Sequence, residues 1–150
     1  MRMRGTMRVR DRWREDRGSS LLEFALISFT FVIILLSVVE MGRIVLVYTC
    51  IANAARAGAR YAIVHGGDQT ASPSGPGSVT NVQTVVSNFA SAGLVNTALL
   101  TTTVSYPNGN NTAGSPVRVT VTYPYDPLVS FFSSMLNTTL SSTSEGVITY

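Results

Sequence analysis

The residues that could do chemistry in this chain are few and far apart. There is one histidine (His65), one cysteine (Cys50) and no lysine, so the sequence offers neither a metal-ligand cluster nor a cysteine–histidine pair for nucleophilic catalysis. The serines of SPSGPGS do not match a nucleophile elbow, and no glycine loop of the phosphate-binding type occurs. We therefore predict that the protein is not an enzyme and that it uses no cofactor, metal or small-molecule substrate.

The titratable residue in the most unusual place is Glu23, in the stretch RGSSLLEFALISF. It is followed by sixteen uncharged residues, from Phe24 to Val39. A carboxylate in an apolar setting is costly unless a positive group neutralises it, and such a pair would be its chemistry. Near a helix end the side chain can instead reach the membrane interface and do nothing more. Position alone leaves both interpretations open.

Charge is distributed as in a membrane-anchored protein. Residues 1–18 hold seven arginines and three acids, a net of +4, whereas residues 19–150 have a net of −1. No basic face remains for a nucleic acid. An arginine-rich start before an apolar run predicts one membrane span over residues 19–42, with the N-terminus in the cytoplasm and the chain outside after about Arg43. The apolar residues assigned to the span are Leu21, Leu22, Phe24, Leu26, Ile27, Phe29, Phe31, Val32, Ile33, Ile34, Leu35 and Leu36.

The helix is predicted to continue beyond the membrane, over residues 43–66, because no proline occurs before Pro73. Glu40 and Arg43 are spaced to pair where it emerges. Gly66 or Gly67 is expected to end it in the left-handed conformation, and His65 to interact with the last carbonyls. An apolar stripe with helical spacing is formed by Ile44, Val47, Ile51, Ala55, Gly58 and Ala62. The small residues Ala54, Gly58 and Ala62 fall on one line, which can pack closely on the protein's own outer domain or on a partner helix or sheet.

After a linker at residues 67–79, residues 80–150 are predicted to form an extracytoplasmic α+β domain. Its first helix, 80–93, has a capping-box pattern of Thr80 with Gln83 and an apolar face of Val82, Val85, Val86 and Phe89. Strands are expected at 101–107 and 117–125, joined through turn residues, with a last strand near 140–150. A short helix is expected over 126–136, N-capped by Asp126 and with Pro127 at its first position. Its apolar face consists of Leu128, Phe131, Phe132 and Met135.

The predicted fold class is therefore α+β. A long N-terminal membrane-spanning spine helix carries a small antiparallel sheet of about three strands and short helices on its outer half. About seventy residues bury little by themselves, so the sheet needs the helix as its other layer.

The N-terminal segment also resembles a known family. RGSSLLEFALI is similar to the processing site of type IV prepilins, and glutamate followed by phenylalanine is the form found in Flp/Tad pili. The helix end NAARAGARYA and the later stretch VRVTVTYPYDPL resemble TadE-like minor pilins, or pseudopilins. The likeness covers about residues 17–66 well and the remainder loosely.

That resemblance implies a role in assembling Flp/Tad (type IVb) pili, which serve in adhesion or secretion. Residues 1–18 would be a leader that a prepilin peptidase removes by cutting between Gly18 and Ser19. Glu23, followed by Phe24, would then meet a mature N-terminal amine, commonly a neighbour's, and set the register of the helices. The partners would be other pilins and inner-membrane Tad components, and the location the bacterial inner membrane. Ser19 replaces the usual phenylalanine, and the length favours a minor rather than a major pilin.

Two other classes of protein remain open. The chain can be a signal-anchored extracytoplasmic protein that binds a partner through its outer domain without entering a filament. It can also be secreted after ordinary signal peptidase cleavage, for which IANA offers a site ending at Ala54. The apolar run is too long for a signal-peptide core, which counts against secretion.

Overall fold

The computed structural model describes residues 9–68, 73–93 and 95–149, with only the backbone described for 9–18. The predicted leader thus lies partly outside the described residues. The chain divides into two compact units, Met1–Val39 and Glu40–Tyr150. The elements are α1 (Val9–Val64), α2 (Thr80–Ser91), the 3₁₀ turn η1 (Thr97–Leu99), β1 (Thr101–Ser105), β2 (Pro116–Tyr125), the 3₁₀ turn η2 (Ser130–Phe132), α3 (Ser133–Leu136) and β3 (Thr138–Val147).

In the first unit, α1 carries no charged residue from Phe24 to Val39. The segment Ser19–Val64 contains a window with a mean hydropathy of 2.5, none of it buried, and is long and apolar enough to cross a membrane. The hydroxyls of Thr30 and Ser37 donate to the carbonyls of Leu26 and Ile33, at 3.0 and 2.8 Å. These two hydroxyls are thus satisfied by the backbone of their own helix, as a lipid environment requires.

The second unit contains a three-stranded antiparallel sheet in the order β1-β2-β3. β2 pairs with β3 along ten residues and with β1 along five. Alternate β2 side chains face inward and are buried, namely Val117, Val119, Val121, Tyr123 and Tyr125. The predicted α+β class, with its three strands and short helices, is confirmed.

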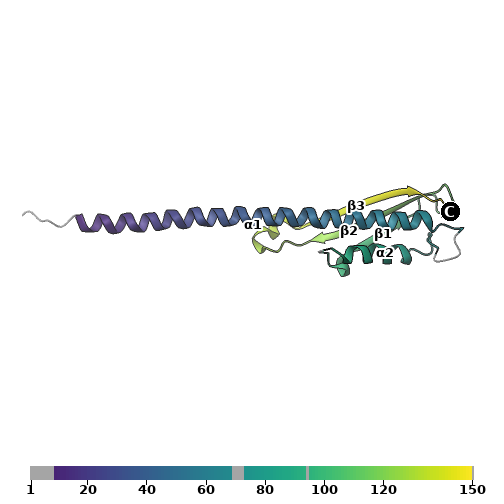
Figure 1. Ribbon diagram of the computed structural model, residues 1–150, viewed down its shortest axis with the longest axis horizontal. Helices are drawn as coiled ribbons and strands as arrows, with labels where there is room; N and C mark the ends of the chain where they lie inside the picture. Colours follow the sequence, from purple (N-terminus) through teal and green to yellow (C-terminus); the bar gives the residue numbers. More distant parts are fainter. Residues whose placement is uncertain (1–8, 69–72, 94, 150) are drawn as a thin grey trace, which may run out of the picture. The chain divides into compact units, whose positions relative to one another are not determined.

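The core of this unit lies between the inner sheet face, α2 and the second part of α1, which run side by side in Figure 1. From α1 it takes Val47, Ile51, Ala54, Ala55, Ala59 and Ala62, and from α2 it takes Val82, Val86 and Ala90. The predicted stripe on α1 is thus buried within the protein's own domain. On α2 the prediction was partly wrong, because Ala90 completes the buried face and Phe89 is exposed.

Gly58 is where α1 comes closest to the other layers. A Cβ built there would lie 2.5 Å from Val86 Cγ2 on α2 and 3.3 Å from Val119 Cγ1 on β2. We expect Gly58→Leu to lower the free energy of unfolding of the second unit by about 3 kcal/mol, because the side chain overpacks the core. Thermal unfolding of the detergent-solubilised chain, followed by circular dichroism, measures this.

The matched control is Gly42→Leu in the same helix, where a Cβ would meet nothing within 4 Å. That variant should be neutral or more stable by up to about 1 kcal/mol, because leucine has the higher helix propensity. Equal melting temperatures for the two variants would contradict the close packing at Gly58.

Two local predictions about helix ends were wrong. α2 begins after Val79 with no side-chain cap, because Gln83 donates to the carbonyl of Thr102 instead of closing a capping box. Positive φ angles occur among the described glycines only at Gly109 and Gly114, so neither predicted glycine adopts the left-handed conformation after α1.

Distant segments satisfy the end of α1 instead. The backbone N–H and the hydroxyl of Ser74 donate to the His65 carbonyl at 2.7 and 2.8 Å. The backbone N–H of Thr149, just past β3, donates to the Ile63 carbonyl at 3.0 Å. Tertiary contacts therefore satisfy carbonyl groups at the end of α1, where a local glycine cap was expected.

The predicted helix over 126–136 was also wrong. Only η2 and the single turn α3 form there, and Asp126 caps neither. Its carbonyl accepts from Arg43 at 2.8 Å, and the N–H of Leu128 donates to Glu40 at 3.3 Å. Because α1 side chains bind these backbone groups, the segment is held away from helical geometry up to Val129, which is extended.

Candidate functional site

The residues predicted to carry the function lie on α1. Gly18 and Ser19 are both helical, so the bond between them lies within the regular helix. Ser19 and Glu23 are four residues apart, and so about one turn of helix, or 6 Å, separates them along one face. Ser19, Glu23 and Phe24 are exposed.

The Glu23 carboxylate has no hydrogen bond or ion pair with any residue that the structure describes. Glu40 and Glu145, by contrast, each contact an arginine. An unpaired carboxylate on an apolar helix face can accept hydrogen bonds from an ammonium group and be neutralised by it. The Glu23 carboxylate on this helix face can therefore bind one positively charged group.

A second polar group, the Glu40 cluster, consists of Glu40, Arg43 and Tyr125 with the backbone at Asp126 and Leu128. Glu40 is only 1% exposed. Its carboxylate accepts from the Tyr125 hydroxyl, from Arg43 Nη1 at 3.4 Å and from the Leu128 N–H at 3.3 Å. The Arg43 guanidinium also lies 5.0 Å from the centre of the Tyr125 ring. The cluster joins α1 to the end of β2.

Burial is the main reason that the pKa of Tyr125 is raised to about 12, and its hydrogen bond to Glu40 adds to the rise, while the charge of Arg43 opposes it. The phenol therefore stays neutral and keeps donating to the carboxylate at physiological pH. Since Oε1 of Glu40 accepts from Arg43, Tyr125 and Leu128, the cluster is suited to holding α1 and the end of β2 together.

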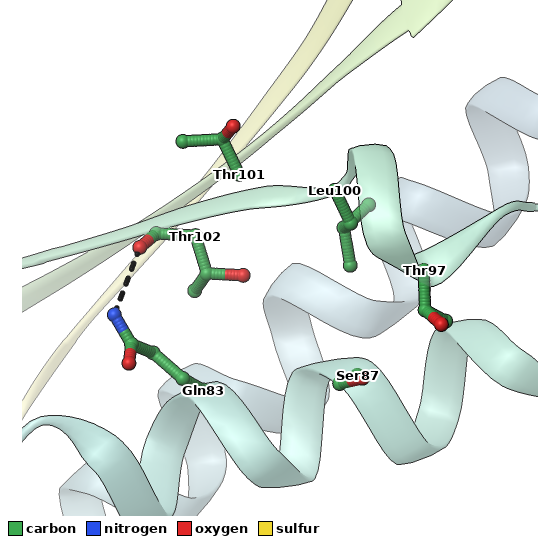
Figure 2. A pocket seen from close by; sticks show the side chains of 6 residues that line it. All are labelled: Gln83, Ser87, Thr97, Leu100, Thr101 and Thr102. Carbon is green, nitrogen blue, oxygen red and sulfur yellow. Dashed lines mark hydrogen bonds between the residues drawn. The ribbon is translucent and has the colours of Figure 1, made fainter.

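A pocket of about 350 Å³ lies between α2 and the chain from η1 to β1 (Figure 2). Gln83 and Ser87 line it from α2, and Leu100 points toward that helix. The remaining lining residues are Thr97, Thr101 and Thr102. The Gln83 amide is already bound to the Thr102 carbonyl at 3.3 Å. None of the six has a titratable side chain, so the pocket offers hydroxyl contacts without an acid or a base to activate them.

Other reactive side chains are engaged in packing. His65 Nδ1 lies 3.0 Å from the Tyr61 carbonyl, and its ring stacks on Tyr61 at 3.9 Å, which confirms its predicted interaction with the helix end. Burial raises the pKa of the Cys50 thiol, so little thiolate forms. Among the described residues, no group of three or more metal-ligating side chains comes together.

The spacing of Glu40 and Arg43 predicted their ion pair, but Tyr125 was not predicted as the third member of the cluster. The signal was present, because Tyr125 continues the alternation of Val117, Val119, Val121 and Tyr123 and so had to face inward. A buried tyrosine needs a partner for its hydroxyl, and Glu40 supplies it.

Comparison with known protein families bears on α1, which holds Gly18, Ser19, Glu23 and Glu40. A family model described as TadE-like protein matches residues 18–60. This part of α1 is similar to the TadE-like family. The match covers the candidate residues and most of the core residues that α1 contributes. Comparisons with curated proteins and with solved structures found no match.

Proposed function

We propose that this chain is a TadE-like minor pilin, or pseudopilin, that acts in the assembly of Tad pili. The observation that carries the proposal is the TadE-like match, whose first residue is Gly18. The proposed cut follows that same residue. The apolar helix with one acid, Glu23, close behind Gly18 supports this reading.

In this proposal a prepilin peptidase cuts between Gly18 and Ser19 and removes the arginine-rich leader. The mature chain remains in the bacterial inner membrane with residues after about Arg43 outside. The cut frees an amine at Ser19, one helical turn from Glu23. The carboxylate then pairs with an amine, its own or that of a neighbouring subunit, and the pair aligns the helices.

The N-terminal residue of the membrane-extracted protein tests the proposal. Edman sequencing or mass spectrometry should find Ser19 when an active prepilin peptidase is present, and Met1 when it is absent. Retention of Met1 in both cases favours a signal-anchored, partner-binding protein. An N-terminus at Ala55 indicates secretion after ordinary signal peptidase cleavage. Either result contradicts the minor-pilin proposal.

A matched pair of variants shows whether the cut depends on the local residue. Gly18→Leu should leave the chain uncut, because the leucine side chain fills the space that the peptidase needs beside the scissile bond. Gly42→Leu, in the same helix and with open space around it, should be cut normally. Loss of processing in both variants would point to a general defect of insertion instead.

A further inference from the structure

An apolar segment on the second unit is left uncovered. Residues 127–136, here called the apolar loop, follow β2 and include η2 and α3. Leu128, Phe131 and Met135 are 71%, 65% and 77% exposed. No charged residue occurs from Pro127 to Ser144. Soluble surfaces seldom gather exposed large apolar side chains in this way without a binding role.

The apolar loop is attached at a particular level of α1. The N–H of Leu128 donates to Glu40, and the carbonyl of Asp126 accepts from Arg43. Glu40 directly follows the sixteen uncharged residues of the proposed span. The start of the apolar loop is therefore fixed where the hydrophobic part of the helix ends.

Apolar side chains of α1 that follow Glu40 in the sequence are exposed as well. Met41 and Val45, one turn apart, are 64% and 60% exposed. Phe131 and Phe132 contact each other edge to face at 5.3 Å, so the loop presents a fixed aromatic pair. Amphipathic segments with aromatic and aliphatic residues and no acidic charge are suited to the boundary between lipid headgroups and acyl chains.

We propose that the apolar loop enters the outer surface of the lipid bilayer that α1 crosses. Leu128, Phe131 and Met135 reach the acyl-chain boundary, while the serines and Asn137 remain among the headgroups. The inference rests on the proposed membrane anchoring of α1. The bilayer is favoured over a protein partner because the loop carries no charge to specify one and because its attachment point, Glu40, adjoins the span.

This second attachment would orient the outer domain. A single helix lets a domain rotate about the membrane normal and tilt, whereas a loop inserted beside it fixes which side of the domain faces the lipid. Depths of about 5–10 Å are usual for such interfacial segments, which is within reach of side chains the size of phenylalanine and methionine.

Tryptophan fluorescence in vesicles tests the inference on the full chain. The natural Trp13 is replaced by Trp13→Phe, and Phe131→Trp then supplies the only tryptophan. The protein is reconstituted in phosphatidylcholine vesicles with bromine atoms near the headgroup end of the acyl chains. Emission from position 131 should be blue-shifted and quenched at least about twofold more than from an exposed site outside the bilayer.

Two reference variants in the same Trp13→Phe background make the outcome decisive. Val147→Trp is the matched control, since Val147 is 55% exposed and lies at the other end of β3, about 30 Å from the loop. Phe29→Trp reports on the proposed span. Quenching at position 131 that equals that at 147, with strong quenching at 29, overturns the inference but leaves the anchor intact.

The other outcomes are equally clear. Absence of quenching at position 29 shows that α1 is not in the bilayer, and the membrane anchoring itself then fails. A blue shift at 131 that appears only at high protein-to-lipid ratio, without quenching by bromine, shows that a second copy of the chain covers the loop. That result also overturns the lipid assignment.

Discussion

The variant Glu23→Ala is expected to be cut after Gly18 like the natural chain and yet to be lost from pili. Removal of one partner from a charge pair in a low-dielectric environment costs about 3 kcal/mol, which corresponds to more than a hundredfold in an equilibrium constant. Immunoblots of the membrane fraction should show mature protein, whereas sheared pili or pilus counts should fall sharply.

Two variants separate the charge from general disturbance of the helix. Glu23→Gln keeps the shape but removes the charge, so it should assemble as poorly as Glu23→Ala. Ser20→Ala changes an exposed residue on the same turn and should leave assembly unchanged. Normal piliation in Glu23→Gln would mean that the carboxylate only reaches the interface and pairs with no amine.

The variant Glu40→Ala is expected to destabilise the second unit strongly. It leaves the Tyr125 hydroxyl without its acceptor and the Arg43 guanidinium with the Asp126 carbonyl as its remaining close acceptor among the described residues. The loss of a buried, hydrogen-bonded charge costs about 3–5 kcal/mol. Thermal unfolding of the full chain in detergent should show a melting temperature lower by about 10–20 °C.

Glu145→Ala is the matched control, since Glu145 also pairs with an arginine, Arg118, but on the exposed face of the sheet. Its loss should cost about 0–1 kcal/mol. Equal effects of the two substitutions would contradict the central place of Glu40 in holding α1 to β2.

The pKa of Tyr125 gives a second readout of the same cluster. It is raised from 10.0 to about 12, so the neutral phenol contributes stability that is present below about pH 10 and lost as the pH rises toward 12. In Glu40→Ala the pKa should fall, because the hydrogen bond and the negative charge that raise it are gone. Ultraviolet titration of tyrosinate, with Tyr125→Phe as reference, should show this shift to lower pH.

Much of the fold could be predicted because its main signals are periodic. The alternation in β2 and the apolar stripe on α1 identified the buried faces, and the glycine and asparagine turn placed two strands side by side. The predictions for the helix ends were wrong. Gln83, the glycines after α1 and Asp126 each had a favourable local pattern, but a contact with a distant segment satisfied the backbone instead.

The candidate functional residues also include some that could be predicted from local sequence and some that could not. The spacing of Gly18, Ser19 and Glu23 could be predicted, because all three lie within two turns of one helix. The Glu40 cluster joins residues more than eighty positions apart in the sequence. Only the pair on α1, Glu40 and Arg43, could be predicted, because these two residues are three positions apart on one helix. The exposure of the apolar loop was beyond prediction too, since it depends on Leu128 and Asp126 being bound to α1 and not on the composition of the loop.

The attachment of α1 to the sheet at two levels has a mechanical consequence. One attachment is the Glu40 cluster and the other is the bond from Thr149 to Ile63, about 35 Å farther along the helix. With the packed core between them, a pull along the helix axis loads both attachments at the same time, in shear. Contacts in that geometry break together and not one after another. The second unit should therefore resist tension along α1 better than a sideways force that peels β3 from the sheet.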